Sequence, residues 1–287
     1  MLYLDNMKEF LKKIHLFGLF KKIQWLFNEL TRPRYRATPL AGGLERIGTN
    51  YGGWMIPRGL FNQSSICYLA GAGEDISLDV GIVEKYGSQA FIFDPTPGAV
   101  AHFKDLIEKT ERGEKMPINN SSTEFYSLSR KNIPLLHFQD LGLWNKADTM
   151  KLYCPINPDW KTAHSLTNLQ KTSDYVLVKT DRLSNIMKNL GHKKIDLLKI
   201  DIEGSEYRVI DSIVEDNLDI KCICVEFDEV GYHLDMFYFF RIYRAIKQLL
   251  RQGYKIINIT PHYNVTFLRK DLIYETEGSS GEDKKLS

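Results

Sequence analysis

The feature that most constrains the fold is a regular alternation of short apolar runs with helical patterns, which begins at residue 65. The apolar runs predict strands at residues 65–70, 89–93, 135–139, 195–200, 220–225, 255–259 and 265–268. The helical patterns predict helices at residues 76–86, 98–110, 183–190, 207–214 and 238–252. Such alternation is typical of βαβ units with right-handed crossovers. We therefore expect an α/β fold with a doubly wound, mostly parallel sheet and an antiparallel hairpin at its C-terminal edge.

The composition is that of a globular protein that works in a reducing compartment. The 287 residues are 43% hydrophobic and 26% charged, and the net charge of +2 is too small to indicate a nucleic-acid partner. The four cysteines form no CxxC pair, and Cys222 and Cys224 have the spacing that puts both thiols on one face of a strand. We expect buried free thiols. No signal peptide or spanning segment is recognisable, so the expected location is cytoplasmic, with peripheral contact at the inner face of a membrane as an option.

The chain divides into three segments: a basic amphipathic helix and connector at residues 1–47, an α/β domain at 48–275 and a disordered tail at 276–287. Residues 8–31 repeat apolar side chains every three or four positions, with lysines on the other side. Such a helix packs on the body, packs on a second subunit of a homo-oligomer, or lies on an anionic membrane.

Two stretches lack a clear pattern and are expected to border the acceptor site. Residues 32–64 are interpreted as a connector, in which Tyr51 to Trp54 form a loop that folds over a site. Residues 145–175 are interpreted as an irregular insertion on the substrate side.

An adenosine-type cofactor is indicated by the residues that follow the first three strands. Glycines after the first strand allow close approach of the backbone to a ligand, and Asp94 after the second can accept hydrogen bonds from ribose hydroxyls. Asp140 after the third can accept from an adenine amino group, although an ordinary turn residue fits equally well. The candidate cofactor-binding residues are Ala70, Gly71, Ala72, Gly73, Asp75, Asp94, Asp140 and Leu141.

The charge of the glycine turn distinguishes between two cofactors. A dinucleotide needs a third glycine where this chain has Ile76, and Glu74 and Asp75 would repel its pyrophosphate. Acidic side chains suit the positive sulfonium and amino group of S-adenosyl-L-methionine. The sequence therefore favours that donor over NAD.

Acidic side chains also follow the fourth and fifth strands. Strand alternation puts Lys199, Asp201 and Glu203 on one side of the chain, and Glu226 and Asp228 end the next strand. A lysine inside a buried strand is costly unless it is paired or used. If the fourth and fifth strands are neighbours, their ends would bring these carboxylates together in one mouth at the edge of the sheet. Alternatively, the carboxylates form a solvated acidic rim there.

These residues resemble a known family. The run from Leu198 to Glu206, LKIDIEGSE, is similar to the hallmark motif of FkbM-type methyltransferases. Residues 179–183, Val225-Glu226, the glycine turn and Asp94-Pro95 also match, although the family more often has Glu at position 94. The resemblance implies a class I, Rossmann-like methyltransferase domain at 48–275, S-adenosylmethionine as donor, and O-methylation of a sugar in a glycan or glycolipid, or of a secondary metabolite.

In that reaction a hydroxyl must be positioned and deprotonated. We expect Asp201 to organise the site, Glu203 or Glu226 to act as base, and Lys199 to hold a carboxylate ionised. A divalent metal on Asp201, Glu226 and Asp228 is a less favoured alternative, so no metal ligand is assigned. An NAD-dependent oxidoreductase or epimerase, and a non-catalytic partner subunit that binds the donor or a glycan, remain competing interpretations. The expected partner is a small-molecule or carbohydrate acceptor.

Overall fold

The computed structural model describes residues 17–157 and 163–273. Its main feature is a seven-stranded sheet with the order β11-β12-β10-β9-β3-β4-β5. The strands are β3 (Ile66–Ala70), β4 (Gln89–Phe93), β5 (Leu136–Gln139), β9 (Ile195–Ile200), β10 (Ile220–Glu226), β11 (Tyr254–Ile259) and β12 (Asn264–Arg269). Strand β12 runs antiparallel to both its neighbours, and the other pairs are parallel. The predicted mostly parallel sheet with a C-terminal antiparallel hairpin is confirmed.

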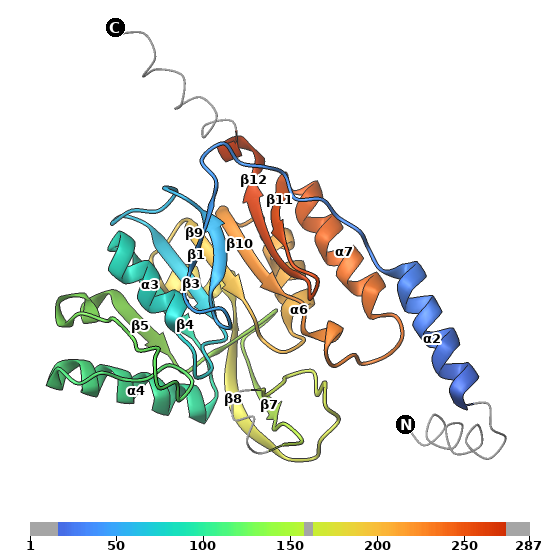
Figure 1. Cartoon of the computed structure of the whole chain (residues 1–287), viewed down its shortest axis with the longest axis horizontal. Coiled ribbons are helices and arrows are strands. Elements are labelled where there is room, and N and C mark those ends of the chain that lie inside the picture. The colour runs from blue at the N-terminus through green and yellow to red at the C-terminus, as the bar shows by residue number, and fades with distance from the viewer. Residues whose placement is uncertain (1–16, 158–162, 274–287) are drawn as a thin grey trace, which may run out of the picture.

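Helices cover both faces of this sheet (Figure 1). They are α3 (Ser77–Tyr86), α4 (Pro97–Arg112), α5 (Leu183–Leu190), α6 (Glu206–Glu215) and α7 (Tyr238–Arg251), with short 3-10 turns η1 (Arg130–Leu135) and η2 (Asp228–Val230). Alternate residues of β3 point to opposite faces: Tyr68 packs with α5, α6 and α7, whereas Cys67 and Leu69 pack with α3 and α4. Burial on both faces explains why these strands are continuous apolar runs.

Two expectations about irregular segments are wrong. The connector at 32–64 contains an antiparallel hairpin of β1 (Leu44–Ile47) and β2 (Trp54–Pro57), which packs over α3. The insertion at 145–175 contains β7 (Asp148–Tyr153), which joins β6 (Gly142–Trp144) and β8 (Tyr175–Arg182) in a three-stranded sheet. These strands are short or alternate with exposed polar residues, so they present no apolar run.

The predicted N-terminal helix is seen in part. Helix α2 (Phe17–Thr31) lies at the outer side of α7 (Figure 1). Residues 8–16 and the predicted tail at 276–287 lie outside the described residues, so the division at 1–47, 48–275 and 276–287 stays a prediction. In the described ranges no helix is both long and apolar enough to cross a membrane. All four cysteines are free, and Cys67, Cys222 and Cys224 are buried as predicted.

The carboxyl ends of β3 and β9 touch at Gly71. This glycine has φ +84°, and a Cβ atom placed on it would lie 1.6 Å from the carbonyl oxygen of Asp201. The Asp201 amide donates to the Ala70 carbonyl at 3.2 Å, and the Gly71 amide donates to the Phe93 carbonyl at 3.0 Å. Glycine is therefore required where the candidate cofactor turn meets the acidic strand end.

We predict that Gly71→Ala destabilises the fold far more than its backbone angle alone would. Gly59 has a similar φ of +72°, but no atom lies within 4 Å of the position that its Cβ would take, so Gly59→Ala is the matched control. The control should lose about 1 kcal/mol of unfolding free energy, and Gly71→Ala at least ~2 kcal/mol more because of overlap with the Asp201 backbone. Urea denaturation measures both values, and equal losses would contradict the close approach.

Candidate active site

An acidic mouth, made by Asp201, Glu226 and Asp228, lies at the carboxyl ends of β9 and β10. One carboxylate oxygen of each residue lies within 4.8 Å of the others. The two strands are parallel neighbours, with Val225 paired to Ile200, so their ends deliver these acids to one place. The structure thus brings together three of the four acids that the sequence analysis assigned to one mouth. The fourth, Glu203, lies in the loop after β9, where the backbone is no longer extended, so the strand alternation expected to join it with Lys199 and Asp201 does not reach it.

Lys199 is a buried cation beside this mouth. Its side chain is 8% exposed, and its Nζ forms an ion pair with Asp201 Oδ2 at 2.8 Å and donates to the Gly71 carbonyl. Burial opposes the charged form, but the Asp201 carboxylate outweighs this effect, so the pKa of Lys199 is raised. The lysine joins the glycine turn of β3 to the acidic end of β9.

Glu203 occupies a strained position beside the mouth. Its φ of +53° lies in the left-handed region, which non-glycine residues rarely adopt. Its carbonyl accepts from Ser165 Oγ at 2.6 Å, which ties the segment around Ser165 to the β9–α6 loop. Burial, followed by the charges of Asp201 and Glu206, raises the pKa of Glu203 from 4.5 to about 8.

Burial also raises the pKa values of the carboxyl groups of Glu226 and Asp228. The pKa of Glu226 rises from 4.5 to about 7, mainly through burial and then through the charge of Asp201. The pKa of Asp228 is also raised, by burial and then by the charge of Glu206. A set of carboxyls whose pKa values reach neutrality can hold protons or a cation at physiological pH.

Sequence reasoning missed the role of Glu206. This residue is fully buried, and its Oε1 accepts from the amides of Ile202 and Gly204 at 3.2 and 3.0 Å. Because Ser205 makes no side-chain cap at the start of α6, the glutamate holds the preceding loop instead. The signal was present as an acid directly after Gly-Ser, at the first turn of the expected helix. Burial raises its pKa to about 7.

The glycine turn and Asp94 form the second half of the site. Asp94 is buried, and its Oδ2 accepts from the amides of Ala72 and Gly73, both at 2.9 Å, while Oδ1 accepts from the Thr96 amide at 2.8 Å. A carboxylate has about four acceptor positions. Three of these positions on Asp94 already accept from protein amides, which leaves one for a ligand hydroxyl. The two hydroxyls of a ribose would use two positions.

The remaining cofactor candidates lie elsewhere. Asp75 is enclosed by protein: its Oδ2 accepts from Thr49 Oγ1 at 2.7 Å and from Asn119 Nδ2 at 2.9 Å, and its Oδ1 from the Ser77 amide. Asp140 is exposed, and Leu141 packs against the core on the α5–α7 side. Ala70 is fully buried in β3. Their assignment to the cofactor stays a prediction, and Asp75 holds the β1–β2 loop in this structure.

A small cavity joins the two halves of the site. It has a volume of about 50 Å³, and its lining includes Gly71, Asp94, Asp201, Glu203, His164 and Leu166. A cavity of this size admits water-sized molecules. Asp94 and Asp201 open onto the same space.

Tyr51 is a second residue that the sequence did not assign. It lies exposed on the β1–β2 loop, and partial burial, followed by the negative charges of Asp201 and Glu226, raises its pKa. The expectation that the 51–54 loop folds over a site stays a prediction.

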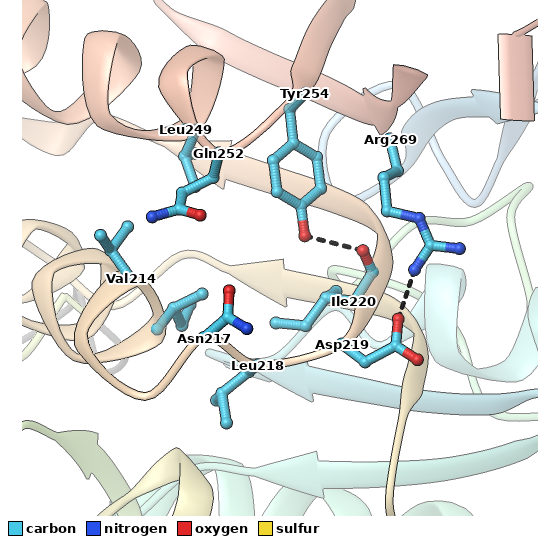
Figure 2. A pocket seen from close by; sticks show the side chains of 10 residues that line it. Val214, Asn217, Leu218, Asp219, Ile220, Leu249, Gln252, Tyr254 and Arg269 are labelled. Atoms are coloured by element: carbon cyan, nitrogen blue, oxygen red, sulfur yellow. Dashed lines mark hydrogen bonds and ion pairs between the residues drawn. The ribbon is translucent and has the colours of Figure 1, made fainter. Parts of the chain in front are cut away.

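A larger cavity, of about 270 Å³, lies at the opposite edge of the sheet (Figure 2). Its lining includes Ile220 at the amino end of β10 and Arg269 at the end of β12. Some of its polar groups are already engaged, because Tyr254 donates to the Ile220 carbonyl at 2.7 Å and Arg269 pairs with Asp219. Ligands of open α/β sheets bind beyond the carboxyl ends of the strands, so the acidic mouth is the better candidate.

Comparison with known proteins finds a family that is similar to part of this chain. Residues 126–256 match the family described as the Methyltransferase FkbM domain. Over these residues, which are somewhat less than half of its length, the chain is therefore similar to FkbM methyltransferases. The match includes the acidic mouth and Glu203 but not the glycine turn and Asp94, whose placement comes from the structure.

Individual relatives are distant from this chain. The human "Probable methyltransferase-like protein 24" is 34% identical over 62 residues, which are 22% of this chain and 16% of that protein. The FkbM methyltransferase of Methylobacillus flagellatus KT is 13% identical, covers 81% of this chain and 48% of its own, and has a TM-score of 0.43. The fibrillarin pre-rRNA processing protein of Methanococcus jannaschii is 12% identical, with 80% and 71% coverage and a TM-score of 0.37. Because both TM-scores are below 0.5, the fold assignment rests on the strand order of the sheet.

The raised pKa of Glu203 predicts a pH-dependent stability. Between pH 4.5 and about 8 the folded protein holds a proton on Glu203 that the unfolded chain has lost, so stability falls as pH rises through this window. Glu203→Gln removes this effect and should gain on the order of 3 kcal/mol over the wild type between pH 5 and pH 8. Urea denaturation in EDTA measures the difference, with Glu111→Gln on the exposed face of α4 as control. Parallel curves for wild type and Glu203→Gln would contradict the assignment.

Proposed function

We propose that this chain transfers a methyl group from S-adenosylmethionine to a hydroxyl of a sugar, glycolipid or secondary metabolite. The observation that carries the proposal is that Gly71, Asp94, Asp201 and Glu203 line one cavity at the carboxyl edge of the sheet. Both halves of a donor-and-acceptor site meet there. The FkbM match supports a methyltransferase, and the choice of a hydroxyl acceptor rests on the acidic mouth.

The charge of the cavity suits a cationic donor. Asp94, Asp201 and Glu203 line it, and the buried Lys199 already has Asp201 and the Gly71 carbonyl as partners. A sulfonium would be attracted to the remaining acidic groups, whereas a pyrophosphate would be repelled. Ile76, where a dinucleotide site needs glycine, is 1% exposed in the core, which further favours the adenosyl donor over NAD.

The chain's own residues can supply the proton transfer. When bound, S-adenosylmethionine supplies an electrophilic methyl group and a good leaving group. Glu203 and Glu226 have pKa values raised to about 8 and about 7, which is the range in which a general base works best near neutral pH. Asp201 is held in place by Lys199 and orients the acceptor hydroxyl, and Tyr51 lies where it can contact the acceptor.

A divalent cation is a second way to activate the hydroxyl. The oxygen atoms of Asp201, Glu226 and Asp228 form a hard donor set of the kind that Mg²⁺ prefers, and Asp228 Oδ2 is a buried atom without a hydrogen-bond partner. A cation there would lower the pKa of a bound hydroxyl. Glu203 would then remain as the base.

Donor binding gives the first test. Asp94→Asn should weaken binding of S-adenosylhomocysteine at least tenfold, because it removes the charge from a hydrogen bond worth ~1.5–3 kcal/mol. Asp201→Asn should instead reduce the preference for S-adenosylmethionine over S-adenosylhomocysteine, since only the former carries the positive charge. Isothermal titration calorimetry measures both effects, and Asp105→Asn on α4 is the control. Unchanged affinities in both variants would sink the proposal.

Cation binding gives a separate test. If Asp201, Glu226 and Asp228 bind Mg²⁺, a concentration near 100 times the Kd should stabilise the protein by about 2.7 kcal/mol. Asp228→Asn should raise the Tm without metal, because it relieves repulsion among the acids, and should lose the response to Mg²⁺. Differential scanning fluorimetry measures the shift, with Glu108→Gln on α4 as control. A wild-type Tm that ignores Mg²⁺ and Mn²⁺ would remove the metal alternative and leave the donor proposal standing.

A further inference from the structure

An exposed apolar surface joins α2 to α7 on the outside of the molecule. On α2 it consists of Ile23, Leu26 and Leu30, and on α7 of Phe237, Phe240 and Tyr243; each of the six is between 45% and 75% exposed. Phe27 connects the two helices, because its ring centroid lies 6.1 Å from that of Phe237 and 6.2 Å from that of Phe240. We call these seven residues the α2–α7 surface; Figure 1 shows the two helices side by side at the edge of the molecule.

The α2–α7 surface is not explained by the fold. The buried side of α7 is filled by residues such as Ile242 and Ile246, and its opposite side carries Phe240 and Tyr243 outward. On α2, Phe27 contacts α7 while its neighbours on the same stripe, Ile23 and Leu30, stay in solvent. A gathering of large apolar side chains on a surface indicates an interaction site.

Positive charge surrounds the α2–α7 surface. Exposed or partly exposed cations near it are Lys22, Arg34, Arg36, Arg244 and Lys247. The acid on the described part of α2, Glu29, has Arg32 and Arg34 within 3.8 Å, and Asp235 beside Phe237 is paired with Arg241 at 3.0 Å. In the sequence, Lys8, Lys12 and Lys13 precede this helix. The apolar area is thus set in a basic rim.

We propose that the α2–α7 surface docks onto an anionic lipid membrane. Apolar and aromatic side chains that are rimmed by lysine and arginine bind at the boundary of headgroups and acyl chains, with the cations on acidic headgroups. A second copy of this chain fits less well. A two-fold interface places the same surface against itself, so two rims in which cations outnumber the acids Glu29, Asp211 and Asp235 would face one another and repel.

Docking would place the active site near the lipid. Phe237 precedes α7 directly, and residues 229–236 connect it to Asp228 of the acidic mouth. The α2–α7 surface therefore begins at the same carboxyl edge of the sheet as the site. The proposal itself concerns binding and does not depend on the methyl-transfer reaction.

Vesicle binding by the full chain tests the proposal. The wild type should co-sediment with phosphatidylcholine vesicles that contain phosphatidylglycerol, and much less with phosphatidylcholine alone. Leu26→Ser with Leu30→Ser should lower the partition coefficient at least tenfold, because two apolar side chains no longer enter the membrane. Lys22→Glu should lower it by roughly fivefold or more, which corresponds to the contribution of one cation near an anionic surface.

Matched control variants distinguish a role of the α2–α7 surface from the general effect of changing an exposed apolar or basic side chain. Leu177→Ser removes an apolar side chain that is 65% exposed on β8, and Lys193→Glu reverses an exposed charge before β9. Both should bind vesicles like the wild type. Equal loss in the control and surface variants would overturn the proposal. So would wild-type binding that is indifferent to phosphatidylglycerol, or a wild-type dimer that the Leu26 and Leu30 changes dissociate while vesicle binding is unaltered.

Discussion

The contact on which the site depends is the buried ammonium of Lys199 between the Gly71 carbonyl and the Asp201 carboxylate. A charge that is 8% exposed must have partners, and removing one from such a pair typically costs ~3–5 kcal/mol. This lysine joins the ends of β3 and β9, which carry the glycine turn and the acidic loop. Glycine at position 71 is the steric condition for the same contact, because any side chain would meet the Asp201 backbone.

One ammonium does not balance the acids that surround it. Burial raises the pKa values of Glu203, Glu206, Glu226 and Asp228, and the charges of neighbouring acids, Asp201 among them, raise those of Glu203, Glu226 and Asp228 further. The ligand-free site must therefore retain protons at neutral pH. A cationic ligand, whether a sulfonium or a divalent metal, would take the place of those protons. Binding of such a ligand and release of protons should be linked.

The sequence predicts the sheet well because its strands are buried on both faces. Strand β4 was predicted at its observed bounds, and β9 was found in spite of Lys199, because the apolar residues around that lysine dominate the pattern. Strands β7 and β8 could not be recognised in this way. Residues such as Lys151 and Lys179 point to solvent on their outer face, and the pairing that defines these strands joins residues far apart in the chain.

The site was predictable to the extent that strand ends determine it. Asp94, Asp201 and Glu226 follow apolar runs, so their position at the carboxyl edge is a consequence of parallel topology. Glu206 and Tyr51 reach the site through a helix start and a loop, and no periodic pattern points to either. The engagement of Asp94 by the Ala72, Gly73 and Thr96 amides depends on the geometry of two turns, which local sequence does not specify.

The backbone strain at Glu203 and access to the small cavity depend on the same segment of the chain. Ser165 donates to the Glu203 carbonyl, and a Cβ atom on Gly204 would lie 2.6 Å from Thr167 Oγ1, so the segment around residues 164–167 rests directly on the β9–α6 loop. A loop held in the left-handed region stores strain that depends on its contacts. Were the segment to move away from this loop, Glu203 would lose one of the contacts that hold its backbone. Its carboxyl would then be more exposed to water, which would lower the penalty for ionisation, so opening of the site and generation of a charged base would be coupled through one residue.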